Sequence, residues 1–336
     1  WRSGPGTTSG GSASGPRSRA GVIDLLDRRL LFVTGKGGVG KTTMAAALAL
    51  LGAQRGKRTL AGEIDAKGDL AAFFETAPTS FKPREVQPGL FAMSMDTEES
   101  LREYLSIHLR LPHVAGIGPL NRIFDFVATA APGVREVLTV GKYAWEVRQR
   151  HYGLVVVDAT ASGHIVGQLA APEAIKDLVH VGLVRQQTEW LEELLADPEQ
   201  TGVVIVTTPE EMPVAETIEL AARLQADTGV HLAAVVVNRV LPELFARGEE
   251  AVFEQLAGVS DDGLLAKQVG GDVAPILEAA RLAVTLRRTR ASHLAHLREN
   301  IDPSVPLLYV PYLFLRYHGL RSIRQVAEAL AAELGY

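Results

Sequence analysis

Short apolar runs alternate with longer stretches of helical periodicity along most of the chain. The runs that predict strands are Leu30–Thr34, Arg58–Ile64, Leu90–Met95, Leu154–Asp158, Val203–Thr207, Ala233–Val237 and Leu307–Val310. Most of these runs are apolar almost without interruption, which is typical of parallel strands that are buried on both faces of a sheet. Helical patterns separate them, so the order predicts β-α-β units with right-handed crossovers. The expected fold class is α/β, with a mainly parallel sheet flanked by helices.

Two intervals between predicted strands are too long for simple crossovers. Residues 97–150 and 163–200 carry polar helical patterns, and we interpret them as a helical subdomain inserted into the α/β core. A further helical stretch, about 242–300, joins the last two predicted strands. The segment Ser322–Leu334 has apolar residues at helical spacing and predicts a C-terminal packing helix.

Composition narrows the function classes. Residues 1–21 are rich in Gly, Ser and Arg without the apolar stretch of a signal peptide, and they predict a disordered tail. The formal net charge of −5 gives no basic surface for nucleic acid, so no nucleic-acid partner is expected. The chain has no cysteine, which excludes disulfides and thiolate metal sites. No apolar run approaches the ~20 residues that span a bilayer, so we expect a cytoplasmic protein without a stable membrane span.

A phosphate-binding loop follows the first predicted strand. The letters GKGGVGKT fit the pattern G-x-x-x-x-G-K-[ST], and the helical stretch KTTMAAALALLG comes next. Glycines allow backbone N–H groups to turn toward phosphate oxygens, and the helix N-terminus favours anions. Lys41 is expected to reach the β- and γ-phosphates and Thr42 to hold Mg²⁺. The loop residues predicted to bind nucleotide are Gly35, Lys36, Gly37, Gly38, Val39, Gly40, Lys41, Thr42 and Thr43. The motif therefore predicts a P-loop NTPase domain over residues 28–336.

Two carboxylates complete the expected site. Asp158 ends an apolar run and is the candidate second Mg²⁺ ligand, because such sites need a carboxylate at the end of a neighbouring strand. Asp65 follows another predicted strand, where it could orient or deprotonate the attacking water. Either residue could instead be an ordinary turn former or strand-end cap. Glu63 is an alternative for the role of Asp65.

The second lysine of the loop, Lys36, resembles the signature of the deviant Walker A class of P-loop ATPases. This class includes MinD, ParA, the nitrogenase iron protein and the arsenical pump-driving ATPases. The resemblance implies that Lys36 reaches across a dimer interface to the partner's nucleotide. A second cation there would stabilise charge on the transferred phosphoryl group, as an arginine finger does.

Five further segments resemble the arsenical pump-driving ATPases (ArsA) and the tail-anchored-protein targeting ATPases, and are most similar to the paired actinobacterial members. They are EIDAKGDLAAFF at 63–74, VVVDATASGH at 155–164, TTPEEMPVAET at 207–217, VVVNR at 235–239 and VPYLFLRYHGL at 310–320. The resemblance implies ATP and Mg²⁺ as cofactors and places Asn238 at the adenine. It also brings Arg239 and Pro311 to the nucleotide and keeps Asp65 in register.

The chain also departs from this family pattern. Its second switch segment reads DATASGH instead of DTAPTGH, and Asp65 is followed by Ala66 and Lys67 instead of Pro and Ala. Without cysteine, metalloid binding through thiolates is excluded. The leading hypothesis is a Mg²⁺-dependent ATPase, a homodimer or a heterodimer with a paralogous ATPase, that handles a protein client on the helical subdomain. The alternatives are a weakly active ATP-binding subunit that locks a heteromeric complex, and a MinD- or ParA-like positioning ATPase.

Overall fold

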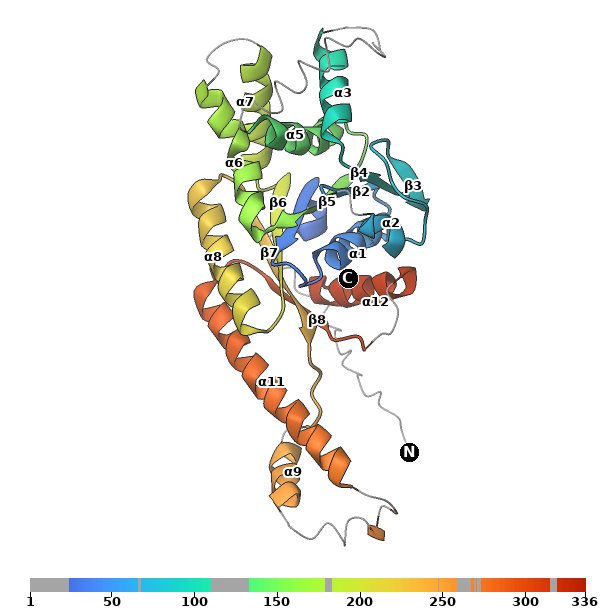
Figure 1. Cartoon of the computed structure of the whole chain (residues 1–336), viewed down its shortest axis with the longest axis vertical. Coiled ribbons are helices and arrows are strands. Elements are labelled where there is room, and N and C mark those ends of the chain that lie inside the picture. The colour runs from blue at the N-terminus through green and yellow to red at the C-terminus, as the bar shows by residue number, and fades with distance from the viewer. Residues whose placement is uncertain are drawn as a thin grey trace, which may run out of the picture.

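The computed structural model describes residues 24–65, 68–109, 133–178, 183–246, 248–258, 267–268, 270, 273–314 and 319–336. The predicted disordered tail, residues 1–21, lies outside them. Within the described residues, an eight-stranded sheet has the order β3-β4-β2-β5-β1-β6-β7-β8 (Figure 1). Neighbouring strands are parallel except β3 and β4, which are antiparallel. The strands are β1 (Leu30–Gly35), β2 (Thr59–Glu63), β3 (Arg84–Gln87), β4 (Leu90–Ser94), β5 (Leu154–Ala161), β6 (Thr201–Thr207), β7 (Leu232–Val240) and β8 (Leu307–Pro311).

The predicted α/β class and all seven predicted strands are confirmed. The largest boundary differences lie at β5 and β7, each of which continues three residues beyond the predicted end. Sequence patterns missed β3, because its four residues are mostly polar and it lies at the sheet edge. An edge strand buries only part of its surface and therefore needs no apolar run.

One face of the sheet packs against α1 (Lys41–Gln54), α2 (Asp69–Phe73) and α12 (Leu320–Leu334). Leu31 and Val33 of β1 point to this face, as do alternate residues of the neighbouring strands. Helix α1 is buried from Met44 to Gly52, because it lies between the sheet and α12 (Figure 1). A helix that is apolar all round is typical of such a central position.

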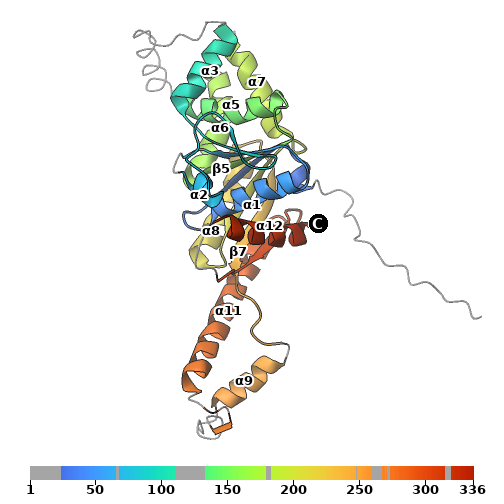
Figure 2. The same ribbon diagram turned by 90° about the vertical axis from the view of Figure 1, so that its right-hand side faces the viewer.

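The opposite face packs against a second helical layer. Its core contains Leu30 and Phe32 of β1 together with side chains from α5, α6, α7, α8 and α11. The helices not introduced above are α3 (Thr97–Leu109), α5 (Val134–Arg148), α6 (Ser162–Leu178), α7 (Leu183–Ala196), α8 (Glu211–Asp227), α9 (Glu249–Gly258) and α11 (Ala274–Asn300), and a short 3-10 helix spans Leu25–Asp27. We call α3, α5, α6 and α7 the insert helices. They gather at one end of the molecule (Figures 1 and 2). Their definition as a subdomain over 97–150 and 163–200 stays a prediction, and residues 110–132 lie outside the described part.

Helices α9 and α11 form an arm at the other end of the molecule (Figures 1 and 2). The 27 residues of α11 correspond to about 40 Å of helix. Its C-terminal part contacts α8, whereas most of its side chains are exposed. Among the described residues, no helix combines the length and the apolar character needed to cross a bilayer.

Candidate functional site

The loop between β1 and α1 has backbone geometry that requires glycine. Gly35, Gly38 and Gly40 have φ angles of 145°, 86° and 98°, which side chains disfavour. A Cβ on Gly35 would lie 2.1 Å from the carbonyl oxygen of Val206 on the adjacent strand. Gly40 is also the N-cap of α1. The backbone of this loop therefore follows a path that glycine adopts easily at these positions and other residues do not.

A pocket of about 430 Å³ opens at this loop, at the carboxyl ends of β1, β2 and β5. Its lining residues are Gly37, Gly38, Gly40, Lys41, Thr42, Thr43, Glu63, Asp65, Asp69, Phe73, Asp158, Ala159 and Ala161. Eight of them were predicted as site residues. The predicted residues outside the lining are Gly35, Lys36, Val39, Asn238, Arg239 and Pro311.

Thr42 and Asp158, the two residues predicted to hold Mg²⁺, lie in direct contact. The Thr42 hydroxyl donates a hydrogen bond of 2.7 Å to Asp158 Oδ2, while the buried Oδ1 of Asp158 has no hydrogen-bond partner. Burial raises the pKa of Asp158 to about 6, with smaller contributions from the charges of Glu63 and Asp69, and the Thr42 hydrogen bond and Lys41 oppose the rise. An orphaned carboxylate oxygen beside a hydroxyl suits a hard cation such as Mg²⁺.

The surroundings of this pair limit what the protein supplies to a cation. The described residues contain no group of three or more His, Asp or Glu side chains able to hold a metal on its own. An ion at Thr42 and Asp158 would therefore need further oxygen ligands from phosphate and water, which is usual for Mg²⁺. Asp158 lies within β5 and not at its end, since the strand continues to Ala161.

The two lysines of the loop have different surroundings. Lys41 Nζ lies in the pocket and donates to the carbonyl oxygen of Lys36 at 3.3 Å. Lys36 Nζ instead forms an ion pair with Glu216 of α8 in the same chain. The side chains of Lys36 and Glu216 are 29% and 32% exposed, so the pair is open to solvent and exchangeable.

Asn238, near the end of β7, supports the phosphate loop from behind. Its Nδ2 donates a 2.8 Å hydrogen bond to the carbonyl oxygen of Val39, and its Oδ1 accepts one from the backbone N–H of Arg239. A Cβ on Gly40 would lie 2.5 Å from the same Nδ2. Arg239 has a positive φ of 59° and is exposed, as is Pro311 on the adjacent β8. Adenine recognition by these residues stays a prediction.

Two residues of the site were not recognised as such from the sequence. Glu63, considered only as a substitute for Asp65, is buried and accepts hydrogen bonds from the backbone of the α2 start. Its signal was a charged residue inside an otherwise apolar strand. Tyr143 of α5 donates to the carbonyl oxygen of Glu63. Nothing local marks Tyr143, because its contact joins segments 80 positions apart.

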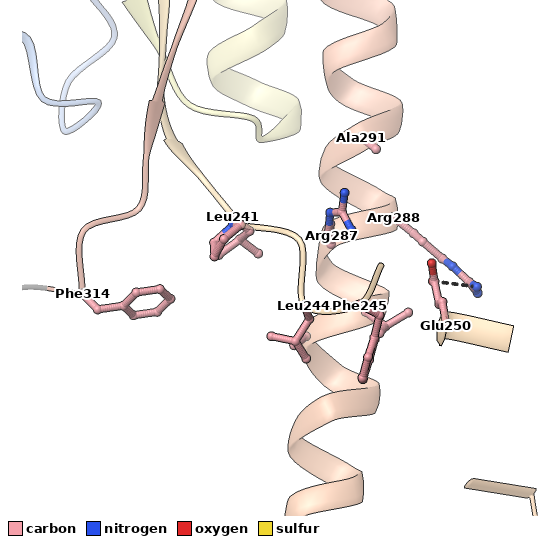
Figure 3. Close-up of a pocket in the computed structure, with 11 residues that line it drawn as sticks. Leu241, Leu244, Phe245, Glu250, Arg287, Arg288, Ala291 and Phe314 are labelled. Carbon is pink, nitrogen blue, oxygen red and sulfur yellow. Dashed lines mark ion pairs between the residues drawn. The ribbon is translucent and has the colours of Figure 1, made fainter. Parts of the chain in front are cut away.

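A second pocket, of about 290 Å³, lies at the base of the arm (Figure 3). Leu241, Leu244 and Phe245 line it from the segment after β7, and Phe314 reaches it from the segment after β8. Arg287 and Arg288, from the basic segment LRRTR at 286–290, also line it. The arginines of this segment pair with glutamates: Arg287 with Glu243, Arg288 with Glu250 and Glu254, and Arg290 with Glu210. This pairing favours a structural role for the segment over phosphate binding.

Comparisons with known proteins find similarity to ATPases. Residues 28–186 and 184–255 match the family described as anion-transporting ATPase. The chain is 32% identical to the ATPase BagA of Mycobacterium tuberculosis, over 97% of this chain and 98% of that protein. It is 25% identical to the arsenical pump-driving ATPase of Escherichia coli, over 69% of this chain and 44% of that one. It is 26% identical to the ATPase GET3 of Podospora anserina, over 46% of each chain.

Proposed function

Because the chain belongs to the anion-transporting ATPase family, we propose that it is a Mg²⁺-dependent ATPase whose nucleotide-gated dimer handles a client or partner. The observation that carries this proposal is the meeting of Lys41, Thr42, Asp65 and Asp158 in one glycine-walled pocket. A phosphate loop alone binds nucleotide. The side chains add the positive charge of Lys41, two candidate ligands for one Mg²⁺ ion, and a carboxylate that can orient the attacking water. Together they form the minimum set for phosphoryl transfer to water.

Each residue has a distinct proposed task. The loop N–H groups and Lys41 bind the β- and γ-phosphates and stabilise the charge that develops on them. Thr42 and Asp158 would hold Mg²⁺, which when bound neutralises charge on the phosphates. Asp65 orients the attacking water and accepts its proton. Asn238 keeps the loop in position and, as the resemblance implies, contributes to adenine binding with Arg239 and Pro311.

Lys36 has a separate role in a dimer of this chain with itself or with a paralogous ATPase. In the single chain it pairs with Glu216, outside the pocket lining. We propose that dimer closure exchanges this pair for the nucleotide of the partner, so that turnover depends on association. The insert helices are the proposed client surface, since α5 and α6 pack on strands that border the pocket.

Nucleotide binding tests the proposal independently of turnover. Isothermal titration with ADP and Mg²⁺ should show one site for the wild-type chain and a loss of at least about tenfold in affinity for Lys41→Ala. Lys57→Ala is a matched control, because Lys57 pairs with Asp27 outside the pocket. No binding by the wild type, or equal binding by both lysine variants, would refute the assignment.

The Lys36–Glu216 pair also favours a second candidate function. A chain whose signature lysine is engaged internally could serve as an ATP-binding subunit that turns over little by itself and locks a complex with a paralogous ATPase. Turnover of the isolated chain separates the two candidates. Hydrolysis that is lost in Asp65→Asn without any partner supports the first, and hydrolysis that needs the partner's own catalytic residues supports the second.

A further inference from the structure

The carboxylate of Glu63 has no task in the proposed ATPase site. The residue is 2% exposed at the end of β2 and borders the pocket. It accepts hydrogen bonds from the backbone N–H of Gly68 at 3.2 Å, the backbone N–H of Asp69 at 3.0 Å and the Ser94 hydroxyl at 3.1 Å. Bonds to a carboxylate are stronger than bonds between neutral groups. The three donors therefore fix Glu63 in one orientation and engage both of its oxygens.

These bonds join the end of β2 to the start of α2. Helix α2 begins at Asp69, and its N-cap residue Gly68 has no side chain that could accept the first N–H groups of the helix. Glu63 supplies those acceptors from the neighbouring strand. Asp65 lies in sequence between the two joined ends and lines the pocket. The bonds of Glu63 therefore tie together the chain on the two sides of Asp65.

The same point of β2 is tied to the insert helices. Tyr143 of α5 is completely buried, and its hydroxyl donates a 3.1 Å hydrogen bond to the carbonyl oxygen of Glu63. A Cβ on Gly62 would lie 2.1 Å from the Tyr143 ring, so the ring occupies the space that any larger residue would need. Packing this close allows little independent movement of β2 and α5.

We propose that Glu63 is a positioning residue that holds Asp65 at the nucleotide pocket, and that Tyr143 couples its position to α5. The inference rests on the proposed ATPase function. It links the insert helices to the water-orienting carboxylate of Asp65 through the contacts at the end of β2. A client that shifts α5 would then change the rate of hydrolysis more than the affinity for nucleotide.

The test replaces Glu63 with Gln, which keeps the shape but puts an NH₂ group, unable to accept, in place of one oxygen. We expect kcat for ATP to fall about tenfold with KM changed less than about threefold, because a mispositioned water-orienting group affects the transition state more than binding. Deuterium uptake at the Gly68 and Asp69 amides should become faster. Tyr143→Phe, which removes only the bond to the Glu63 carbonyl, should lower kcat about threefold in the same way.

Thr59→Val is the control in the same strand. Thr59 is also buried, at the opposite end of β2, where its hydroxyl donates a 2.9 Å hydrogen bond to the carbonyl oxygen of Lys57. The variant should lose stability while keeping kcat and the exchange rates at Gly68 and Asp69. If Glu63→Gln does not fold, Ser94→Ala deletes one of the three bonds and should show smaller changes in the same directions.

Two results would overturn the inference. One is wild-type kcat and exchange in the folded Glu63→Gln or Ser94→Ala chain, and the other is an equal loss of kcat in Thr59→Val. Wild-type protein that does not hydrolyse ATP at all would instead refute the proposed function. In that case the exchange rates of the Gly68 and Asp69 amides decide by themselves whether Glu63 holds this segment.

Discussion

Asp158 is predicted to weaken the metal-free protein, and replacing it with Asn should stabilise the fold. The pKa of this carboxyl in the folded chain is about 6 and its ordinary value is 3.8. Burial is the main cause, so the ionised form costs free energy in the folded state and not in the unfolded chain. Asn keeps an oxygen for the Thr42 hydroxyl and removes the charge.

The pH dependence follows from these two values. Below pH 3.8 the carboxyl is mostly protonated in both states and does not lower the free energy of unfolding. As the pH rises from 3.8 to about 6, it ionises more readily in the unfolded chain than in the folded protein, so the folded protein loses stability over this range. The gain from Asp158→Asn should therefore be up to about 3 kcal/mol at pH 7.5 and about 1.5 kcal/mol at pH 5. For a chain of this length, 3 kcal/mol corresponds to roughly 5 °C in Tm.

Thermal unfolding without metal or nucleotide, at both pH values, measures the effect. Asp302→Asn is the control, because hydrogen bonds from Ser304 lower the pKa of this exposed carboxyl, so its substitution should not stabilise the protein. Adding ADP and Mg²⁺ should raise the Tm of the wild type more than that of Asp158→Asn, because the variant keeps the loop and Lys41 but lacks one proposed Mg²⁺ ligand. An Asp158→Asn protein that is less stable than the wild type at pH 7.5, or equally shifted at both pH values, would refute the reasoning.

Three further predictions concern the packing around the pocket. Gly62→Ala should lower the free energy of unfolding by about 1–3 kcal/mol, because its Cβ would meet the Tyr143 ring. In the double variant, Tyr143→Leu should recover part of this loss. Strictly additive losses in denaturant melts would contradict the close contact. Asn238→Asp should weaken ADP affinity more than Asn238→Ala, because the new carboxylate oxygen would lie against the carbonyl oxygen of Val39, which needs a donor. Equal affinities in titration calorimetry would argue against support of the phosphate loop by Asn238. Glu216→Gln should free Lys36 and strengthen ATP-dependent dimerisation in sedimentation experiments, an effect that Lys36→Ala should abolish.

The sequence was sufficient for features that depend on neighbouring residues. The apolar runs predicted seven strands because burial on both faces leaves a continuous signal, and the glycine spacing predicted the loop because Gly35 and Gly40 need positive φ angles. The Thr42–Asp158 contact was also predictable, since parallel strands deliver their following residues to one edge.

Other features depend on residues that meet only after folding. The hydrogen bond from Asn238 to Val39 joins residues 199 positions apart, and the Lys36–Glu216 ion pair joins residues 180 positions apart. Contacts over such separations leave no local sequence pattern. The resemblance therefore suggested adenine binding for Asn238 but gave no sign of its hydrogen bond to the phosphate loop. The polar edge strand β3 was missed for a different reason, because an exposed edge imposes no apolar periodicity.

Phosphate release from ATP tests the central claim most directly. Initial rates should be measured with and without Mg²⁺ for the wild type, Lys41→Ala and Asp65→Asn, with Lys57→Ala as the control. The account predicts Mg²⁺-dependent turnover for the wild type and Lys57→Ala, and losses of about 100-fold or more for the two pocket variants. Turnover that survives Lys41→Ala unchanged would contradict it, as would its absence from the wild type both alone and with a paralogous partner.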